Sequence, residues 1–502
     1  MAKIDLKAYL KFLPIIFFVT LTLWLRLVNL GYSDYQGDEL KALYLPDSGQ
    51  SLSDYLFEQR KGPTQFIATY LIYLVHPTYS NQFLTRLPFA LVGILAIFVF
   101  YHFVKLNYGK KIALYAAFFL TINGLFVGLM RIVQYQPFVI LFSVLALYAF
   151  SLALNFERWR NTGIYLGVIA WALAILTHYD GVFIAPYAAY LIVRWYRKHS
   201  EVTAGNKLKH LTLAGLVGGI LLASFYIPFL LSVSDSTLEY WINRTTGEFE
   251  WTIPSSIFTF QLYNPLLGIY IYALLGLLSL LKIRRTYPLI LWFLFPWIIL
   301  EAFIIDPGTH IYTYILPASI LVAFGVLVIE EFIVRLLGEG YGVSLTAFAM
   351  SAVILLLFSI SHFVFVDHTP EYPWEERRLL FWTIGKPSIE YRIWAFGFPY
   401  YRHWEAIGDF ITSTENNGYY STNENKSIAS HFVPNIFSIN DSGYYIHIHN
   451  PQSLRDKLVD DKIRYWTKNY QPIKVFKNNN TVVSEIYDMP EGNVLEIKEA
   501  GY

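Results

Sequence analysis

The chain has 502 residues, of which 55% are apolar and 15% charged, and its mean hydropathy is +0.40. A soluble protein of this size needs more charge to cover its surface, so the composition indicates an integral membrane protein. The formal net charge of +1, without a basic cluster, gives no reason to expect a nucleic-acid partner. The absence of cysteine excludes disulfides, thiol catalysis and Cys-ligated metal sites, and is compatible with a prokaryotic cell membrane.

The first predicted element is a transmembrane helix over the apolar run 12–30, which follows Lys3, Lys7 and Lys11. No small-residue cleavage site follows the run, so we expect a retained helix rather than a cleaved signal peptide. The lysines before it place the N-terminus in the cytoplasm.

Further apolar stretches follow along the chain, at residues 84–106, 112–130, 138–154, 163–177, 182–195, 211–231, 262–281, 289–305, 311–329 and 343–365. Each is near the length needed to cross about 30 Å of hydrocarbon, so with the first helix we expect about eleven spans. The stretch 64–75, between Pro63 and Pro77, is too short to cross.

The basic residues decide the orientation. If residues 64–75 do not cross the membrane, the loops that fall inside carry Lys110, Lys111, Arg158, Arg160, Arg197, Lys198, Lys207, Lys209, Lys282, Arg284, Arg285 and Arg335. If they cross, all these loops fall outside. The positive-inside rule therefore predicts an interfacial or re-entrant segment at 64–75 and an extracytoplasmic C-terminus.

The composition changes near residue 367, where Tyr, Asn, Ser, Asp and Lys begin to dominate. Short apolar patches such as 481–487 are typical of strands. The fold class is therefore mainly α: residues 1–366 form a polytopic transmembrane helix bundle, and residues 367–502 form a small extracytoplasmic α/β domain. Residues 367–401 are expected to be an aromatic connector along the membrane surface.

Polar residues gather in the loops predicted to lie outside. The first outer loop, 31–83, contains Asp38, Glu39 and Lys61, and the later ones contain Arg131, Gln134, Tyr135, His178, Asp180, Trp241, Arg244, Trp251, Asp306, His310 and Tyr312. Ionisable groups near membrane depth are costly and usually face a cavity or a partner. For a single residue such as Asp47, simple solvation is the more common explanation, and Arg131 is as readily a helix-end arginine that reaches the headgroups.

Several motifs occur in a fixed order over roughly residues 12–330: Gly37-Asp38-Glu39-Leu40, Lys61-Gly62-Pro63, the segment 85–93 (TRLPFALVG), Asn107-Tyr108-Gly109, the segment 177–181 (THYDG) and the segment 310–317 (HIYTYILP). This series resembles the GT-C superfamily of membrane glycosyltransferases. Within it, the series is most similar to the protein O-mannosyltransferase and lipid A aminoarabinose transferase group (glycosyltransferase family 39-like). His178 and His310 depart from that pattern because lysine is common at both positions. The C-terminal domain matches no known motif.

The resemblance implies an inverting transfer of a sugar from a polyprenyl-phosphate donor to a protein, lipid or glycan acceptor at the outer membrane face. Such a reaction needs a base near the acceptor and positive charge near the phosphate. The resemblance makes Asp38 the catalytic base, with Glu39 as its catalytic neighbour. The residues assigned to the donor phosphate are Lys61, Arg131, Arg244, His310 and Tyr312, and those assigned to the sugar or acceptor are Gln134, Tyr135, His178 and Asp180. Trp241 and Trp251 are further candidates for stacking on a sugar.

No cofactor is required by the sequence, and metal dependence stays open. His178, Asp180, Asp306 and His310 are a candidate set for a divalent metal together with the acidic pair, but no His-x-x-His or His-x₃-His spacing supports it. His447 and His449 alternate in the predicted strand 444–449 and therefore share one face, as a weak ligand pair or as a surface feature.

Two other functions remain open from the residues alone. A transporter or flippase of lipid-linked saccharides is the main alternative, although internal repeats and polar residues at mid-span, which are typical of transporters, are not seen. An oligosaccharyltransferase-like enzyme usually has a second acidic motif in the next outer turn, where this chain has Arg131, Gln134 and Gln136.

Overall fold

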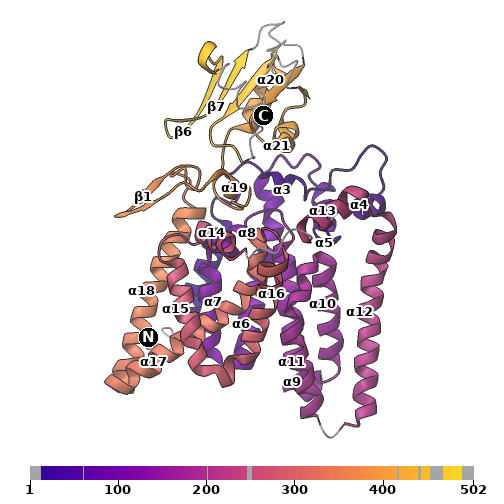
Figure 1. Ribbon diagram of the computed structural model, residues 1–502, viewed down its shortest axis with the longest axis vertical. Coiled ribbons are helices and arrows are strands. Elements are labelled where there is room, and N and C mark those ends of the chain that lie inside the picture. The colour runs from indigo at the N-terminus through magenta and orange to yellow at the C-terminus, as the bar shows by residue number, and fades with distance from the viewer. Residues whose placement is uncertain are drawn as a thin grey trace, which may run out of the picture.

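The computed structural model describes residues 13–59, 61–199, 202–245, 252–414, 418–438, 443–452 and 467–488. A bundle of long helices carries a smaller part, rich in strands, on one of its ends (Figure 1). The three N-terminal lysines and Trp251 lie outside the described residues.

Helices occupy every apolar stretch that the sequence analysis identifies. They are α2 (Leu13–Leu27), α6 (Gln82–Tyr108), α7 (Lys110–Ile122), α8 (Gly124–Leu129), α9 (Gln136–Asn155), α10 (Thr162–Thr177), η2 (Tyr179–Ile184), α11 (Ala185–Lys198), α12 (Ala204–Ser232), α15 (Gly268–Leu278), η3 (Ser279–Lys282), α16 (Ile283–Phe303), α17 (Tyr312–Leu337) and α18 (Glu339–Phe365). Within the described ranges, five helical segments are long and apolar enough to cross a membrane: Gln82–Tyr108, Gln136–Asn155, Ala204–Ser232, Gly268–Phe303 and Glu339–Phe365. The number of about eleven spans stays a prediction.

The outer face of α12 shows that hydrocarbon must surround the bundle. Leu216, Ile220, Leu230 and Leu231 all leave more than half of their side-chain surface exposed. A continuous apolar surface of this kind is rare on soluble monomers because water contact is unfavourable. The chain is therefore an integral membrane protein, as its composition predicts.

Two asparagines interrupt apolar stretches that the sequence analysis reads as continuous. Asn123 ends α7, and its side-chain oxygen accepts a hydrogen bond from the Leu125 N–H, which starts α8. Asn264 ends α14 (Ile253–Tyr263) before α15 begins. The two breaks meet, because the Gly124 N–H donates to the Asn264 side chain at 2.8 Å. The polar side chains thus satisfy backbone groups that each broken helix leaves unpaired.

Short helices gather at the end of the bundle that faces the C-terminal part (Figure 1): α3 (Gly37–Leu40), α4 (Leu52–Glu58), α5 (Thr64–Tyr73), α13 (Asp235–Thr245) and α14. The helix α5 corresponds to the stretch expected not to cross. Its 10 residues give a length of about 15 Å, half of the hydrocarbon thickness.

The basic turns lie together at the opposite end of the bundle. Lys111 pairs with Glu330, and Lys282 with Glu331, which brings the start of α7, the end of η3 and the last turns of α17 together. The connections α6–α7 and α17–α18 turn at Gly109 and Gly338, whose φ angles of +92° and +81° favour glycine.

The C-terminal part follows directly after α18, which ends at Phe365. It contains a hairpin of β1 (Arg377–Leu379) and β2 (Trp382–Ile384), the helices α19 (Ile389–Arg392), α20 (Trp404–Thr412) and α21 (Lys426–Phe432), and the strands β3 (Tyr419–Thr422), β4 (Ile436–Phe437), β5 (Tyr444–Ile448), β6 (Lys474–Asn478) and β7 (Thr481–Asp488). The five-stranded sheet has the order β4-β3-β5-β7-β6, with β3 parallel to β4 and β5, and β7 antiparallel to β5 and β6. This mixed sheet with helices confirms the predicted small α/β fold.

The C-terminal part packs on the loop that carries Asp38. The Asp34 N–H donates to the Tyr400 carbonyl at 2.8 Å, and the Arg402 N–H donates to the Asp34 carboxylate at 2.6 Å. A Cβ on Gly37 would lie 3.2 Å from the Asn425 side chain, so α3 and the start of α21 are in close contact. The domain thereby fixes one side of the first loop.

Candidate active site

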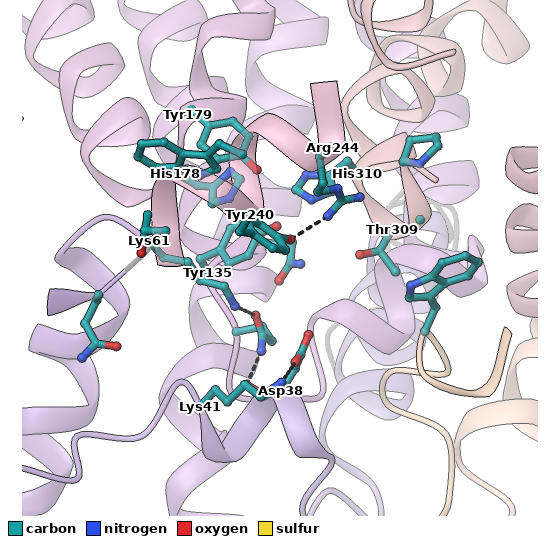
Figure 2. A pocket seen from close by; sticks show the side chains of 18 of the residues that line it. Asp38, Lys41, Lys61, Tyr135, His178, Tyr179, Tyr240, Arg244, Thr309 and His310 are labelled. Atoms are coloured by element: carbon teal, nitrogen blue, oxygen red, sulfur yellow. Dashed lines mark hydrogen bonds and ion pairs between the residues drawn. The ribbon is translucent and has the colours of Figure 1, made fainter. Parts of the chain in front are cut away.

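One cavity of about 490 Å³ opens at the end of the bundle that carries the short helices. It is lined by Asp38, Lys41, Glu58, Gln59, Lys61, Phe66, Gln134, Tyr135, Gln136, His178, Tyr179, Ser234, Thr237, Tyr240, Trp241, Arg244, Asp306, Pro307, Gly308, Thr309, His310, Trp394 and Phe396. Figure 2 shows Asp38 and Lys41 on one side of this cavity and Arg244, His178 and His310 on the other. All five predicted outer loops contribute to it.

Asp38 lies in α3 with its side chain 41% exposed, and its carboxylate accepts from the Lys41 ammonium at 3.3 Å. Two hydrogen bonds fix its backbone: the N–H donates to the Gln36 side chain at 2.7 Å, and the carbonyl accepts from the Gln134 side chain at 2.6 Å. The carboxylate is therefore held at the cavity while it keeps room for another partner.

Glu39 points the other way and is fully buried. Its two oxygens accept from the Arg86 guanidinium at 2.8 and 2.7 Å, and also from the backbone N–H groups of Val133 and Gln36. Arg86 in turn donates to the carbonyls of Leu30, Ser33 and Asp34. The structure thus does not bring Glu39 into the cavity. Instead, Glu39 anchors the loop that carries Asp38.

Lys61 reaches the cavity from the segment before α5. Its ammonium donates to the Gln134 side chain at 3.0 Å and lies 5.0 Å from the centre of the Tyr135 ring, within cation–π range. A Cβ on Gly62 would lie 1.9 Å from the Leu176 carbonyl oxygen, so only glycine allows this approach to α10. The three predicted residues Lys61, Gln134 and Tyr135 therefore form one wall.

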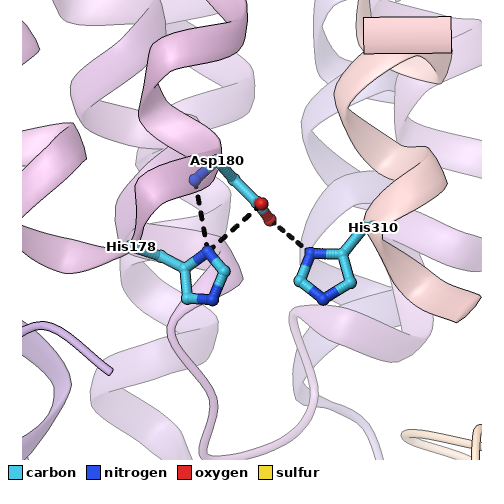
Figure 3. A group of neighbouring side chains, drawn as sticks. All are labelled: His178, Asp180 and His310. Carbon is cyan, nitrogen blue, oxygen red and sulfur yellow. Dashed lines mark hydrogen bonds and ion pairs between the residues drawn. The ribbon is translucent and has the colours of Figure 1, made fainter. Parts of the chain in front are cut away.

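His178, Asp180 and His310 form a compact group of side chains (Figure 3). The Asp180 carboxylate lies 3.2 Å from His178 Nδ1 and 2.8 Å from His310 Nδ1, and the Tyr312 hydroxyl donates to it at 2.9 Å. The rings of His178 and Tyr135 stack at 4.0 Å. His178 and His310 line the cavity, whereas Asp180 and Tyr312 lie behind them.

The charge state of this group follows from its burial. Burial lowers the pKa of His178 to about 4, against the attraction of Asp180, so this imidazole is neutral. Burial alone would raise the pKa of Asp180, but the two imidazoles hold it well below its usual range.

Arg244 comes from α13 and spans the rim of the cavity. Its guanidinium donates to the Tyr240 hydroxyl at 2.8 Å and to the Asp306 carbonyl at 2.6 Å. These bonds connect α13 to the turn before His310. The guanidinium of Arg244 therefore lies at the site, although α13 contains none of the predicted motifs.

Arg131 does not reach this cavity. It is buried and donates to the Leu25 carbonyl at 2.9 Å, beside a second, small cavity of about 20 Å³ that Glu39 and Arg86 also line. Burial and the nearby Arg86 lower its pKa to about 9. Its hydrogen bond connects the turn before α9 to the first helix, α2, so the structure gives Arg131 a structural contact rather than a place in the large cavity.

The connector, residues 367–401, supplies cavity residues that no sequence motif indicates. Trp394 and Phe396 line the cavity, and both are held by Tyr263, whose hydroxyl donates to the Trp394 carbonyl and accepts from the Phe396 N–H at 2.9 Å. The Trp394 ring lies against Gly308, where a Cβ would come within 3.4 Å of it. The aromatic composition of residues 367–401 predicts a segment at the membrane surface. No motif in it indicates that some of its residues line a cavity.

The comparisons with known proteins agree with this architecture. Residues 63–227 match the family model described as dolichyl-phosphate-mannose-protein mannosyltransferase. The apo structure of ArnT from Cupriavidus metallidurans covers 94% of this chain and 97% of its own, with a TM-score of 0.51 and 12% identity. The predicted resemblance to the GT-C glycosyltransferases is confirmed.

Two further solved structures have a fold similar to that of the chain. ArnT from Cupriavidus metallidurans bound to undecaprenyl phosphate covers 96% of this chain and 98% of its own, with a TM-score of 0.51 and 12% identity. The archaeal oligosaccharyltransferase AglB from Archaeoglobus fulgidus, in complex with an inhibitory peptide and a dolichol-phosphate, covers 88% and 70%, with a TM-score of 0.51 and 11% identity. At these identities the likeness concerns the fold. A comparison with curated protein sequences found no match.

Proposed function

We propose that the protein is an inverting glycosyltransferase that moves a sugar from a polyprenyl-phosphate donor to a protein, lipid or glycan acceptor. The observation that carries this proposal is that one cavity holds an accessible carboxylate, Asp38, together with two cations, Lys61 beside it and Arg244 on the opposite side. The family match and the GT-C fold support the same reaction class.

Asp38 is the general base of the proposed reaction. The acceptor oxygen attacks the anomeric carbon as Asp38 takes its proton, and the bond between that carbon and the phosphate oxygen breaks on the opposite face. Because attack and departure occur on opposite faces, the configuration inverts. A positioned base of this kind contributes about 10²–10⁴ in rate.

The phosphate leaves with the bonding electron pair and gains negative charge, so it needs cations rather than an acid. Lys61 is held by Gln134, and Arg244 by Tyr240, so both are oriented before the donor arrives. Preoriented donors of this kind stabilise a developing charge without reorganisation. The guanidinium of Arg244 also suits two phosphate oxygens at once.

An apolar groove of about 540 Å³ between α14, α15, α16 and α17 is the place we assign to the polyprenyl chain. His310 lines the polar cavity and the next residue, Ile311, lines this groove. A phosphate in the cavity and an isoprenoid chain in the groove therefore fit on the two sides of one turn.

The aromatic residues of the cavity suit a sugar ring. Tyr135 and Trp394 line the same cavity as Gln134. We assign sugar or acceptor contacts to Gln134, Tyr135 and Trp241, with Trp394 added by the structure.

The proposed orientation places the cavity and the C-terminal domain outside the cell. The cavity lies at the end of the bundle that bears this domain, and the basic turns lie at the other end. The positive-inside rule then makes the end with the basic turns cytoplasmic.

The test compares two carboxylate variants in a strain that lacks the chain. Asp38→Asn keeps the size of the side chain and removes the base. The matched control, Glu58→Gln, changes another carboxylate that lines the cavity and that the Gln50 amide already holds at 2.8 Å. Mass spectrometry of the glycoconjugates and of the lipid-linked sugars gives the readout.

We expect the Asp38→Asn strain to lack the sugar on its acceptor and to accumulate the lipid-linked donor, as the deletion strain does. Glu58→Gln should restore the product. Normal product from Asp38→Asn, at wild-type protein levels, contradicts the role of this residue.

A further inference from the structure

The group His178, Asp180 and His310 has a feature that the sugar-transfer chemistry leaves unexplained. Asp180 is buried, and its Oδ1 atom lies 3.2 Å from His178 Nδ1, which itself accepts from the Asp180 N–H, so no described residue donates a hydrogen bond to this oxygen. The other oxygen, Oδ2, already accepts from Tyr312 and contacts His310. An unsatisfied buried carboxylate oxygen is unfavourable, which points to a missing ligand on that side.

The donor atoms around this oxygen suit a metal ion. One ring nitrogen of His178, one of His310 and a carboxylate oxygen of Asp180 all lie within 4.8 Å of one another. Metal–nitrogen and metal–oxygen bonds of about 2.0–2.2 Å bring such atoms to comparable separations around one ion. His178 Nδ1 also accepts from the Asp180 N–H at 3.2 Å, a long bond that a metal would replace.

From this geometry we infer that His178, Asp180 and His310 bind a divalent transition metal, with a coordination position open to the cavity. Two imidazoles and one carboxylate favour zinc or a similar first-row ion over magnesium, which prefers oxygen ligands. Three protein ligands leave the fourth position free, the arrangement typical of catalytic rather than structural sites.

The two histidines line the cavity, so a metal ion held by them would lie next to the space where we place the donor phosphate. Bound to both imidazoles and to the Asp180 carboxylate, a divalent ion would leave the group with one net positive charge. The ion would then present a Lewis acid to a phosphate oxygen. This role rests on the proposed function, whereas metal binding itself does not.

Tyr312 is the positioning residue of the proposed centre. Its hydroxyl donates to Asp180 Oδ2 and so orients the carboxylate without contacting the cavity. Loss of such an outer partner typically weakens metal binding by about 10–100-fold.

A second histidine group must be removed before the measurement. His447 and His449 both contact Glu485, at 3.2 and 3.0 Å, and their ligand atoms also lie within 4.8 Å of one another. The full-length protein with His447→Asn and His449→Asn therefore serves as the reference, so that bound metal reports on the cavity alone.

The experiment titrates Zn²⁺ and Co²⁺ into this chelator-treated reference protein in detergent, with metal content and the visible Co²⁺ spectrum as readouts. We expect one equivalent of metal and a tetrahedral Co²⁺ spectrum that changes on addition of inorganic phosphate. Asp180→Asn or His310→Asn should weaken binding by at least about 100-fold, and Tyr312→Phe by about 10–100-fold. Size-exclusion chromatography checks that each variant is folded.

Two results overturn the inference: less than stoichiometric metal in the folded reference protein, or unchanged affinity in Asp180→Asn. A Co²⁺ spectrum indifferent to phosphate overturns the open position. The transfer reaction is judged separately, because Asp38→Asn should bind metal normally and still fail to transfer the sugar. Metal binding with full transfer by Asp38→Asn contradicts the proposed function alone, and transfer without metal binding contradicts this inference alone.

Discussion

Glu39 and Arg86 form a buried ion pair whose two contacts measure 2.8 and 2.7 Å, directly beside the accessible Asp38. Adjacent carboxylates thus have opposite environments. The guanidinium and two backbone N–H groups use the oxygens of Glu39, while Asp38 contacts only Lys41 through its side chain among the described residues. The Glu39–Arg86 pair therefore fixes the position of the loop that carries Asp38.

Glu39→Ala should therefore unfold or loosen the first loop. Removing one partner of a buried ion pair leaves an uncompensated charge and costs about 3–5 kcal/mol. We expect a clearly lower midpoint of thermal unfolding for the purified protein. Asp38→Ala is the matched control, because its side chain is partly exposed, and it should leave the midpoint nearly unchanged. Equal midpoints for Glu39→Ala and the wild type would contradict the anchoring role.

The acidic pair shows how far the sequence alone could lead. The motif and the loop charges point to Asp38, which lines the cavity, since a pattern of charge and polarity can place a loop at one end of a bundle. They do not separate Asp38 from Glu39, because the partner of Glu39 is Arg86, which is 47 residues away. Likewise, Arg131 is predicted from its turn, but the direction of its side chain depends on the hydrogen bond that it donates to the Leu25 carbonyl.

Lys61 should matter for the chemical step through its charge. We expect Lys61→Gln to lower kcat by about 10²–10³-fold, the usual loss on removing one preoriented donor to a developing anion. Lys61→Arg keeps the charge and should recover part of kcat. The measurement is a transfer assay with membranes that contain equal amounts of each variant. An equal loss in both variants would show that shape rather than charge is responsible.

Asp34 should make the junction between bundle and C-terminal domain sensitive to pH. Burial raises the pKa of Asp34 to about 7, against the N–H donated by Arg402 and the charges of Arg402 and Arg86. The folded state therefore holds a proton that the unfolded state releases near its ordinary pKa of 3.8. The contribution of this proton to stability is complete below about pH 4, falls as the pH rises to 7, and is constant above that.

The loss between pH 4 and 7 is at most about 4 kcal/mol, at roughly 1.4 kcal/mol per pKa unit. Unfolding midpoints of the wild type and of Asp34→Asn across this range give the measurement. The variant cannot ionise at this position, so the difference between the two proteins should change with pH. A constant difference would mean that Asp34 does not titrate in this range.

The position of the connector residues in the cavity could not be predicted from the sequence. Its aromatic composition predicts a segment at the membrane surface, and Trp394 and Phe396 are indeed held by Tyr263 at the top of the bundle. Their place in the cavity depends on contacts between residues more than one hundred positions apart. Loop polarity reveals which side such residues occupy, whereas only packing reveals which of them face one another. The breaks at Asn123 and Asn264 are hidden for the same reason.

The apolar groove gives the last prediction, which concerns the lipid part of the donor. Ala273 of α15 lines this groove and is exposed, so Ala273→Trp should fill part of it without disturbing the helix core. If the polyprenyl chain binds there, we expect KM for the lipid donor to rise by about 10-fold or more, since each buried methylene contributes about 0.8 kcal/mol. The value of kcat at saturating donor should change little, because the charged cavity is untouched. Leu355→Trp, on the exposed face of α18, is the matched control and should leave KM unchanged. An unchanged KM in Ala273→Trp would place the lipid chain elsewhere, while a loss of kcat alone would show that the groove acts on the chemical step rather than on donor binding.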